Sequence, residues 1–370
     1  MRRCYNLLKQ RKPQREQVIM SYIKKPSAKH PRLPKNQLGL TRRDYEGALS
    51  TLCAGCGHDS VSSAIIEACF NLSIPAHKLA KLSGIGCSSK TPTYFLNKSH
   101  GFNSVHGRMP SVATGANLAN RDLFYLGVSG DGDTASIGLG QFCHIIRRRL
   151  NMLYVVDNNG TYGLTKGQFS ATNDKDSKSK KGEDNLFESI DLAALAIQLG
   201  AGFVARSFSG DKEQLVPLMT AALKYKGFSF IDVISPCVTF NNHIQSTKSY
   251  QYFREHNEAL GFLDVIPDKE EIKIQYDEGT STEVEIHDGS RMVLHKLDKN
   301  HDPYNKSNAL SMLNNHQSDG TVVTGLIYLD KNEMDLHDTI NSNQTPLNAL
   351  SEKELCPGSK GLDFVNKNFS

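Results

Sequence analysis

The residues with the clearest chemical potential lie in two short motifs, GDGD at 130–133 and DNN at 157–159. Each motif directly follows a short apolar run, 123–128 for the first and 152–156 for the second, and such runs are typical of buried strands. A GDG tripeptide alone is most often a turn. Two such motifs joined by one helix-like stretch instead indicate a strand–helix–strand unit with polar residues at both strand ends.

A crossover of this kind returns the chain to the same edge of a parallel sheet, so the residues after the two strands should lie side by side. We therefore expect Asp131 and Asn159 to share one ion. Their carboxylate and amide oxygens suit the octahedral oxygen shell of Mg²⁺. Gly130 and Gly132 allow backbone N–H groups to approach a phosphate, and the N-terminus of the helix that follows carries positive partial charge. The pattern predicts a site for Mg²⁺ and a diphosphate.

The cysteines fall into two groups. Cys69 and Cys143 lie within helix-like apolar patterns and are expected in the core. The C-x₂-C pair at 53–56 alone fits structural zinc, a redox dithiol or half of an iron–sulfur site. A zinc ribbon would repeat C-x₂-C at short range, which this sequence does not, and without a secretory segment a disulfide framework is not favoured. Four cysteines in turn-like segments at the ends of predicted elements are the candidate ligands: Cys53, Cys56, Cys87 and Cys237.

The elements that would position these residues alternate between strand-like and helix-like segments as far as about residue 262. Residues 60–71 and the stretch near 135–150 have helical character, and 228–234 is a further buried-strand run. Such alternation predicts an α/β fold with a mainly parallel sheet and helices on both faces. We expect His58 to cap the first of these helices, and the polar segment 172–184 to form an exposed loop.

Past residue 270 the pattern changes. The runs 282–286 and 291–297 alternate around a DG pair, which predicts a hairpin, and 322–329 is a further candidate strand. We therefore expect three parts: a basic, poorly ordered N-terminal arm at 1–43, a catalytic domain at 44–265, and a C-terminal, β-containing extension at 266–370 with the hairpin and a loosely ordered tail.

Composition and charge narrow the classes of protein that fit. The 370 residues carry 43 Lys+Arg and 39 Asp+Glu, but thirteen of the basic residues and one acidic residue lie in 1–43. Prolines interrupt that segment and aromatic residues are not interleaved with its charges, so nucleic acid binding is not favoured. No run approaches the roughly 18 apolar residues of a membrane span, and no secretory signal is recognisable. We expect a cytoplasmic protein with no nucleic-acid or membrane partner, and Met20 is a second candidate start.

Several motifs together resemble a known family. GDG followed after about 25 residues by NN is similar to the signature of thiamine diphosphate enzymes. In one order, LCAGCGH, SGIGCSSK, HGR, ATGANLAN, DNNGTYGLTKGQ and SPCVTFN resemble the β subunits of 2-oxoacid:ferredoxin oxidoreductases, and YEGALSTLCAGCGHDSV is most similar to the 2-oxoglutarate branch. The resemblance runs over roughly residues 20–360 and is thin after 270.

The resemblance implies a thiamine diphosphate-binding fold and a set of cofactor ligands. Asp131 and Asn159 would bind Mg²⁺ through their side chains and Thr161 through its carbonyl, with Asp133 behind them. One [4Fe–4S] cluster would be held by Cys53, Cys56, Cys87 and Cys237.

The same resemblance implies roles around the cofactor and the substrate. His106 and Arg108 would lie beside the cofactor diphosphate and act in catalysis, although a buried, hydrogen-bonded His is the usual case. Lys90 would border the substrate and Lys166 would meet coenzyme A phosphates, although a Lys is more often only a solvated charge. Further cofactor contacts are expected from Gly130, Gly132, Gly163 and Leu164, with Leu164 also bordering the substrate.

The implied activity is the reversible, coenzyme A-dependent oxidative decarboxylation of 2-oxoglutarate to succinyl-CoA and CO₂, with one-electron transfers through the cluster to ferredoxin. The chain carries only the diphosphate half of a thiamine site, so a separate α subunit is expected to supply the half that binds the aminopyrimidine ring. Two alternatives stay open: the same chemistry on pyruvate or another 2-oxoacid, and a non-catalytic module that binds zinc and a nucleotide.

Overall fold

The computed structural model of the chain describes residues 32–177, 183–238, 272–285, 291–318, 321–332, 334–356 and 358–369. The chain divides into two units, Met1–Pro34 and Lys35–Ser370. Residues 1–31 of the predicted basic arm (1–43) lie outside the described residues, and the fold given below is that of the second unit.

Within the described ranges the strands form a nine-stranded sheet and a two-stranded ribbon. The sheet strands are β1 (Leu79–Ser83), β2 (His100–Asn103), β3 (Phe124–Gly130), β4 (Met152–Asn158), β7 (Phe203–Phe208), β8 (Phe228–Ile234), β9 (Ser281–Glu285), β10 (Arg291–Lys296) and β11 (Thr321–Leu329). The ribbon pairs β5 (Thr161–Tyr162) with β6 (Gln168–Phe169).

The α-helices are α2 (His58–Asn71), α3 (Met109–Ala119), α4 (Leu139–Arg147), α5 (Leu192–Leu199), α6 (Lys212–Lys224), α8 (Lys306–Ser318), α9 (Leu336–Thr339), α10 (Glu352–Leu355) and α11 (Gly358–Phe369). Short 3₁₀ turns are η1 (Arg42–Tyr45), η2 (Ala76–Lys78), η3 (Ser88–Thr93) and η5 (Leu347–Ala349), and η4 (Gly132–Ile137) is a π-helical turn.

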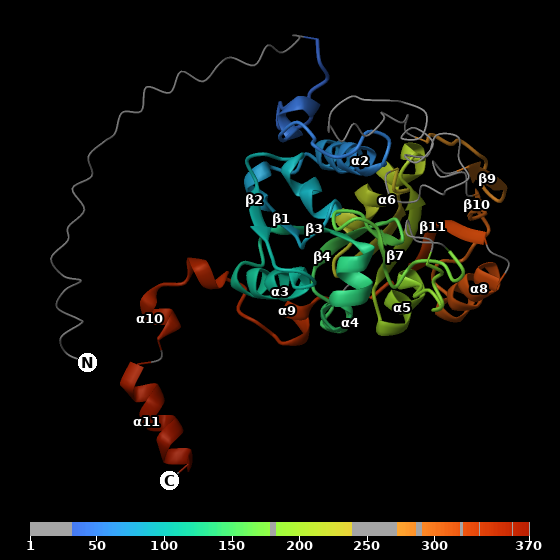
Figure 1. The fold of residues 1–370 in the computed structure, drawn as a ribbon. Helices are drawn as coiled ribbons and strands as arrows, with labels where there is room; N and C mark the ends of the chain where they lie inside the picture. Colours follow the sequence, from blue (N-terminus) through green and yellow to red (C-terminus); the bar gives the residue numbers. More distant parts are fainter. Residues whose placement is uncertain are drawn as a thin grey trace, which may run out of the picture. The chain divides into compact units, whose positions relative to one another are not determined.

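The sheet confirms the predicted parallel α/β architecture (Figure 1). Its strand order is β2-β1-β3-β4-β8-β7-β11-β10-β9, and the first six of these strands are parallel to one another. β11 pairs antiparallel with β7 and carries β10 and β9. The strands after residue 270 therefore continue the same sheet, and β9 and β10 form the antiparallel pair expected around the DG turn.

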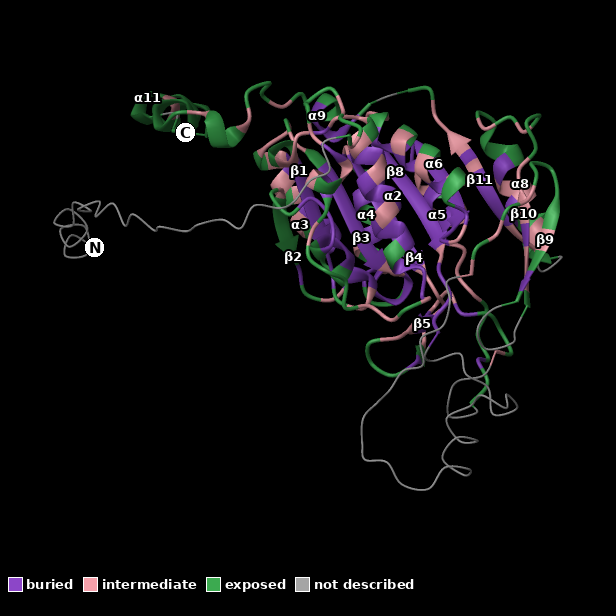
Figure 2. Ribbon diagram, turned by 90° about the horizontal axis from the view of Figure 1, so that it is seen from above, coloured by how far each residue is buried: buried purple, intermediate pink, exposed green. Residues whose placement is uncertain are grey.

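Helices cover both faces of this sheet because successive strand side chains point in opposite directions. On β4, Leu153 and Val155 join the apolar cluster beneath α2 and α6. Tyr154 and Val156 join the cluster formed with α3, α4 and α5 on the other face. Figure 1 shows the strands lying between these helical layers, and Figure 2 shows that the central strands are buried. Because both faces are covered, the strands read as continuous apolar runs, which is why they were recognisable from sequence.

Several predicted elements are found with small shifts. The helix predicted at 60–71 is α2, and the crossover between β3 and β4 consists of η4 and α4. The loop predicted at 172–184 is not uniformly exposed: Thr172 is half-buried and Asn173 is buried, while 178–182 lie outside the described residues. The reason is that Thr172 hydrogen-bonds with buried polar groups at the end of the sheet.

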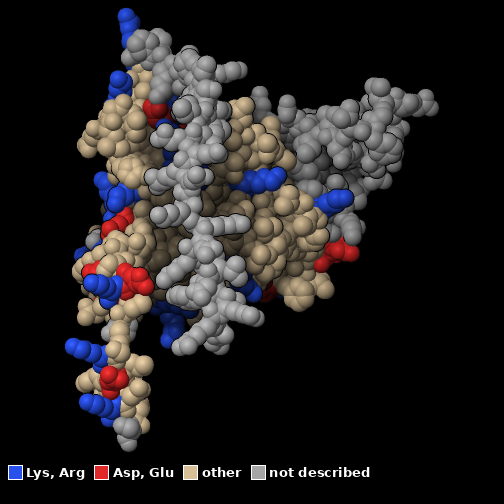
Figure 3. Space-filling view, turned by 90° about the vertical axis from the view of Figure 1, so that its left-hand side faces the viewer, with Lys and Arg blue, Asp and Glu red and all other residues tan. Residues whose placement is uncertain are grey.

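Two surface features bear on the partners of the chain. On the face shown in Figure 3, basic and acidic side chains of the described residues are interspersed rather than gathered by sign. In the described ranges, no helix combines the length and the apolar character needed to cross a membrane.

Candidate functional site

The carboxyl ends of four neighbouring parallel strands carry the predicted ligands. β1, β3, β4 and β8 lie next to one another in the sheet. The residues that follow them are Cys87, Asp131, Asn159 and Cys237, in that order across the sheet. Parallel strands end at one edge, so a single topology delivers two predicted magnesium ligands and two predicted cluster ligands to the same edge.

Asp131 and Asn159 lie side by side, as the crossover predicted. The Asn159 backbone N–H donates to Oδ1 of Asp131 over 3.3 Å, and the Thr161 N–H donates to Oδ1 of Asn159 over 3.0 Å. Asp131 is only 1% exposed, and its Oδ2 accepts hydrogen bonds from the hydroxyls of Ser170 and Thr172. Burial raises the pKa of Asp131, and these hydroxyl and backbone donors offset part of that rise.

A second buried carboxylate lies under this pair. Asp157 follows the apolar run of β4 and is fully buried; its oxygens make no hydrogen bond of normal geometry with the described residues, and the nearby Ser88 hydroxyl only partly opposes the effect of burial on its pKa. Burial, and next to it the charge of Asp131, raises the pKa of Asp157 well above the ordinary value of an aspartate. Two adjoining buried carboxylates favour the binding of positive charge at this edge.

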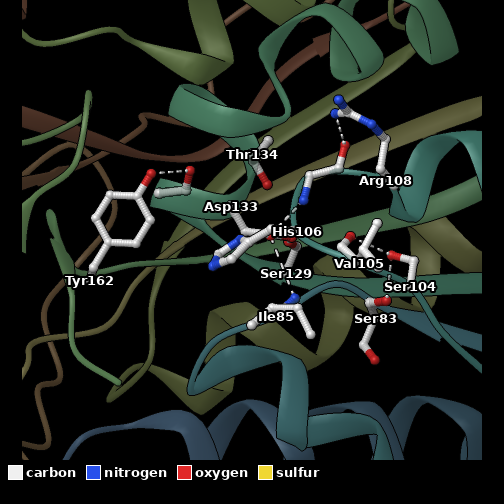
Figure 4. Close-up of polar contacts among 12 residues, drawn as sticks. Ser83, Ile85, Ser104, Val105, His106, Arg108, Ser129, Asp133, Thr134 and Tyr162 are labelled. Carbon is white, nitrogen blue, oxygen red and sulfur yellow. Dashed lines mark hydrogen bonds and ion pairs between the residues drawn. The ribbon is translucent and has the colours of Figure 1, made fainter. Parts of the chain in front are cut away.

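The Asp133 carboxylate connects two loops through hydrogen bonds (Figure 4). Its predicted place next to the Mg²⁺ ligands stays a prediction. Its Oδ1 accepts from the Gly107 N–H over 2.8 Å and from Nδ1 of His106, and its Oδ2 accepts from the Ser129 hydroxyl over 2.6 Å. A Cβ added at Gly84 would lie 1.8 Å from the same Oδ2. Asp133 therefore fixes the HGR segment against the glycine-rich loop that precedes Cys87.

A narrow cleft with a cavity volume of about 30 Å³ opens at this edge of the sheet. Tyr162 forms part of its wall and donates its hydroxyl proton to the Gly132 carbonyl over 2.8 Å. A Cβ at Gly132 would lie 2.6 Å from the Tyr162 ring, so glycine is required for this approach. The predicted site residues that line the cleft are Cys87, His106, Gly130, Asp131, Gly132, Asp133, Asn159, Thr161, Gly163 and Leu164.

Of the predicted catalytic and substrate residues, three do not line this cleft. Arg108 is the N-cap of α3, and its guanidinium donates to the Gly107 carbonyl over 3.4 Å. Lys90 is an exposed residue of η3, and Lys166 is exposed in a turn with left-handed backbone (φ 79°). Their roles stay predictions.

The predicted cluster cysteines lie in loop segments between the regular elements. Burial raises the pKa of Cys56 to about 12 and that of Cys87 to about 11. The neighbouring thiols contribute further: Cys53 acts on Cys56, and both Cys237 and Cys53 act on Cys87. By contrast Cys69, on the buried face of α2, is fully buried in the core, as predicted.

Two predictions for residues near these thiols are wrong. Cys143 is half-buried rather than in the core, because the buried face of α4 consists of Phe142, Ile145 and Ile146 and position 143 lies beside it. His58 does not cap α2 through its side chain. The imidazole is buried and contacts Cys56 and Ser88 instead, and burial lowers the pKa of His58 to about 4.

The residues present fit the groups that the motifs imply. Asp131, Asn159 and the Thr161 carbonyl are all oxygen donors, as Mg²⁺ prefers, and Gly130 and Gly132 line the same cleft. In the described ranges no three His, Cys, Asp or Glu side chains converge as they would on a single metal ion. Each thiolate of a [4Fe–4S] cluster binds a different iron, so four thiols are the donor set that this group would need.

Comparison with known proteins identifies the class of protein to which the chain belongs. Residues 84–233, which contain the cleft, match the family described as thiamine pyrophosphate enzyme, C-terminal TPP binding domain. A 2-oxoacid:ferredoxin oxidoreductase subunit beta from Sulfolobus sp is 37% identical over 217 residues, covering 58% of this chain and 69% of the relative. A 2-oxoglutarate synthase subunit KorB from Methanothermobacter thermautotrophicus is 36% identical over 228 residues, covering 60% of this chain and 79% of the relative. The chain therefore belongs to the β subunits of the 2-oxoacid:ferredoxin oxidoreductase family.

A solved structure agrees with this assignment. A 2-oxoglutarate:ferredoxin oxidoreductase from Magnetococcus marinus, with 2-oxoglutarate, coenzyme A and succinyl-CoA bound, superposes with a TM-score of 0.66 at 26% identity. The match covers 87% of this chain and 96% of that chain. The chain also spans 63% of the length of the 40% identical β subunit from Saccharolobus solfataricus.

Proposed function

We propose that this chain is the β subunit of a 2-oxoglutarate:ferredoxin oxidoreductase. The reaction would be the reversible, coenzyme A-dependent oxidative decarboxylation of 2-oxoglutarate to succinyl-CoA and CO₂, with electrons passed singly through one [4Fe–4S] cluster to ferredoxin. The observation that carries this proposal is the edge of the sheet where β1, β3, β4 and β8 end. The predicted oxygen ligands Asp131 and Asn159 follow the two inner strands of that edge, β3 and β4, and the thiols of Cys87 and Cys237 follow the outer two, β1 and β8.

Thiamine diphosphate, when bound, would supply the electron sink that stabilises a carbanion after loss of CO₂. The chain's part is to hold its diphosphate. Asp131, Asn159 and the Thr161 carbonyl would bind the Mg²⁺, and the backbone at Gly130 and Gly132 would approach the phosphates. The Ser170 and Thr172 hydroxyls keep the Asp131 carboxylate oriented.

We propose that residues on the cleft wall and beside the cleft select the substrate. Lys90 follows Cys87 by three residues and is exposed, so its ammonium group is available to the distal carboxylate of a dicarboxylic 2-oxoacid. Leu164 lies on the cleft wall and would border the substrate. Lys166 is proposed to meet coenzyme A phosphates, and His106 and Arg108 to adjoin the cofactor diphosphate.

An α subunit is proposed to cover the cleft. Several exposed apolar side chains belong to the segments that form the cleft: Val105 is 72% exposed, Leu164 49%, Ile137 47% and Ile85 37%. Exposed apolar residues beside a polar site are typical of a protein interface. Two of them, Ile85 and Leu164, also line the cleft, so a partner bound there would close the site. The relatives' own description as subunits supports this.

The substrate is tested by initial rates of the αβ complex with 2-oxoglutarate, 2-oxobutyrate and pyruvate, using ferredoxin and coenzyme A. We expect the highest kcat/KM for 2-oxoglutarate, and a higher value for pyruvate would contradict the proposal. Lys90→Met should lower kcat/KM for 2-oxoglutarate and leave 2-oxobutyrate unchanged. The matched control is Lys98→Met, another exposed lysine on the same connection, which should leave both substrates unchanged.

A further inference from the structure

One buried side chain joins the two loops that carry predicted cluster ligands. His58 is the first residue of α2 and is 2% exposed. Its Nδ1 lies 3.1 Å from Sγ of Cys56 and 3.3 Å from the Cys56 carbonyl oxygen. At the other end of the ring, Nε2 lies 3.1 Å from the hydroxyl of Ser88, which follows Cys87 in sequence.

The contact with the Cys56 carbonyl shows which ring nitrogen of His58 carries the proton. A carbonyl oxygen can only accept a hydrogen bond, so the Nδ1 that contacts it must carry a hydrogen. That N–H is shared between the carbonyl oxygen and the sulfur of Cys56. The Ser88 hydroxyl can rotate, and it donates to Nε2 in this tautomer. A cysteine bound to iron is a thiolate without a proton, so its sulfur can likewise only accept.

The ring cannot easily turn away from this geometry. It is held by contacts at both nitrogens, and Nε2 also lies 3.9 Å from Oδ2 of the buried Asp157. The Ser235 hydroxyl donates to the same Cys56 carbonyl over 2.7 Å, which fixes the loop from the side of β8. The imidazole N–H is therefore presented to the sulfur by a rigid, buried surrounding.

We propose that His58 is a positioning residue that raises the reduction potential of the cluster through an Nδ1–H hydrogen bond to the Cys56 sulfur. The inference rests on the proposed function, because it requires the cluster. Hydrogen bonds to cluster sulfurs are one of the factors that set cluster potentials. A donor binds more strongly to a sulfur that carries more negative charge, which is the reduced state, so the bond favours reduction.

The test is a redox titration of the αβ complex monitored by electron paramagnetic resonance. His58→Gln retains an amide near the Nε2 position and His58→Leu retains no donor, whereas the shorter His58→Asn places an amide N–H near the Nδ1 position. We expect Gln and Leu to lower the ratio of reduced to oxidised cluster at a fixed potential about tenfold, a shift of about 59 mV for one electron. Asn should stay near the wild-type potential.

A matched control removes a contact of the same residue without touching its ring. The Ser62 hydroxyl donates to the His58 backbone carbonyl over 3.2 Å, and Ser62→Ala should leave the potential unchanged. Loss of iron from the Gln and Leu variants but not from Asn would also support the inference. An unchanged potential in His58→Leu with full iron content, or loss of iron from all three variants, would overturn it. A wild-type complex that lacks the iron–sulfur signal would contradict the proposed function itself.

Discussion

Gly84 offers a sharp test of how the site is assembled. It follows β1, and a Cβ at this position would lie 1.8 Å from Oδ2 and 2.8 Å from Cγ of Asp133. No real Cβ tolerates such contacts, so Gly84→Ala must displace the Asp133 side chain. Asp133 is 3% exposed, and displacement separates its carboxylate from the Ser129 hydroxyl, the Gly107 N–H and the His106 ring.

The cost can be worked out from two contributions. Overpacking a tightly packed site costs about 1–3 kcal/mol, and losing a hydrogen bond to a charged group costs about 1.5–3 kcal/mol. The contributions overlap, because a carboxylate that moves relieves the clash while it breaks the bonds. We therefore expect Gly84→Ala to lower the free energy of unfolding by about 2–4 kcal/mol, and to weaken thiamine diphosphate binding because the HGR segment loses its anchor.

The assay is urea unfolding followed by far-ultraviolet circular dichroism, since the chain has no Trp, together with calorimetric titration of thiamine diphosphate in the presence of Mg²⁺. Gly140→Ala is the matched control. Gly140 lies exposed in α4 with nothing within 4 Å of an added Cβ, so alanine there should be neutral or stabilise by up to about 1 kcal/mol. Equal stability and cofactor affinity in Gly84→Ala and Gly140→Ala would refute the reasoning.

Three further predictions follow from the site. Asp131→Ala should abolish retention of thiamine diphosphate while iron content stays at its wild-type value, because its carboxylate is the charged Mg²⁺ ligand; retention at wild-type affinity would contradict the assignment. Cys237→Ser should lose iron and the cluster spectrum, whereas Cys69→Ser and Cys143→Ser should keep both, and the reverse pattern would show that the fourth ligand is wrongly chosen. Thr172→Val removes a 2.7 Å hydrogen bond to Asp131 and should weaken Mg²⁺-dependent cofactor binding about tenfold, with Thr172→Ser near wild type; equal affinity in both variants would argue against a role for the hydroxyl.

The parts of the fold that were predictable are those with local patterns. β4 and β8 are buried on both faces, so they appear in the sequence as uninterrupted apolar runs. One helical crossover between β3 and β4 was enough to place Asp131 beside Asn159. These inferences need only the spacing of apolar residues along the sequence and the rule that the crossover between two parallel strands is right-handed.

The residues that were missed act through contacts between distant segments. Ser170 and Thr172 reach Asp131 across about forty positions of sequence, and a polar segment that turns back into a site looks the same in sequence as one that is exposed. Gly84 is constrained by a carboxylate 49 residues away. His58 was predicted to cap a helix because it directly precedes the helix-like stretch, and nothing else in the local sequence indicated another role. Its true contacts depend on where the loop after β1 lies.

The most direct test of the central claim is an anaerobic analysis of metal and cofactor in the purified αβ complex. If the chain binds thiamine diphosphate and one [4Fe–4S] cluster, the protein will be brown and will contain about four irons, one Mg²⁺ and one thiamine diphosphate per chain. A colourless protein that contains zinc and no thiamine diphosphate would contradict the account.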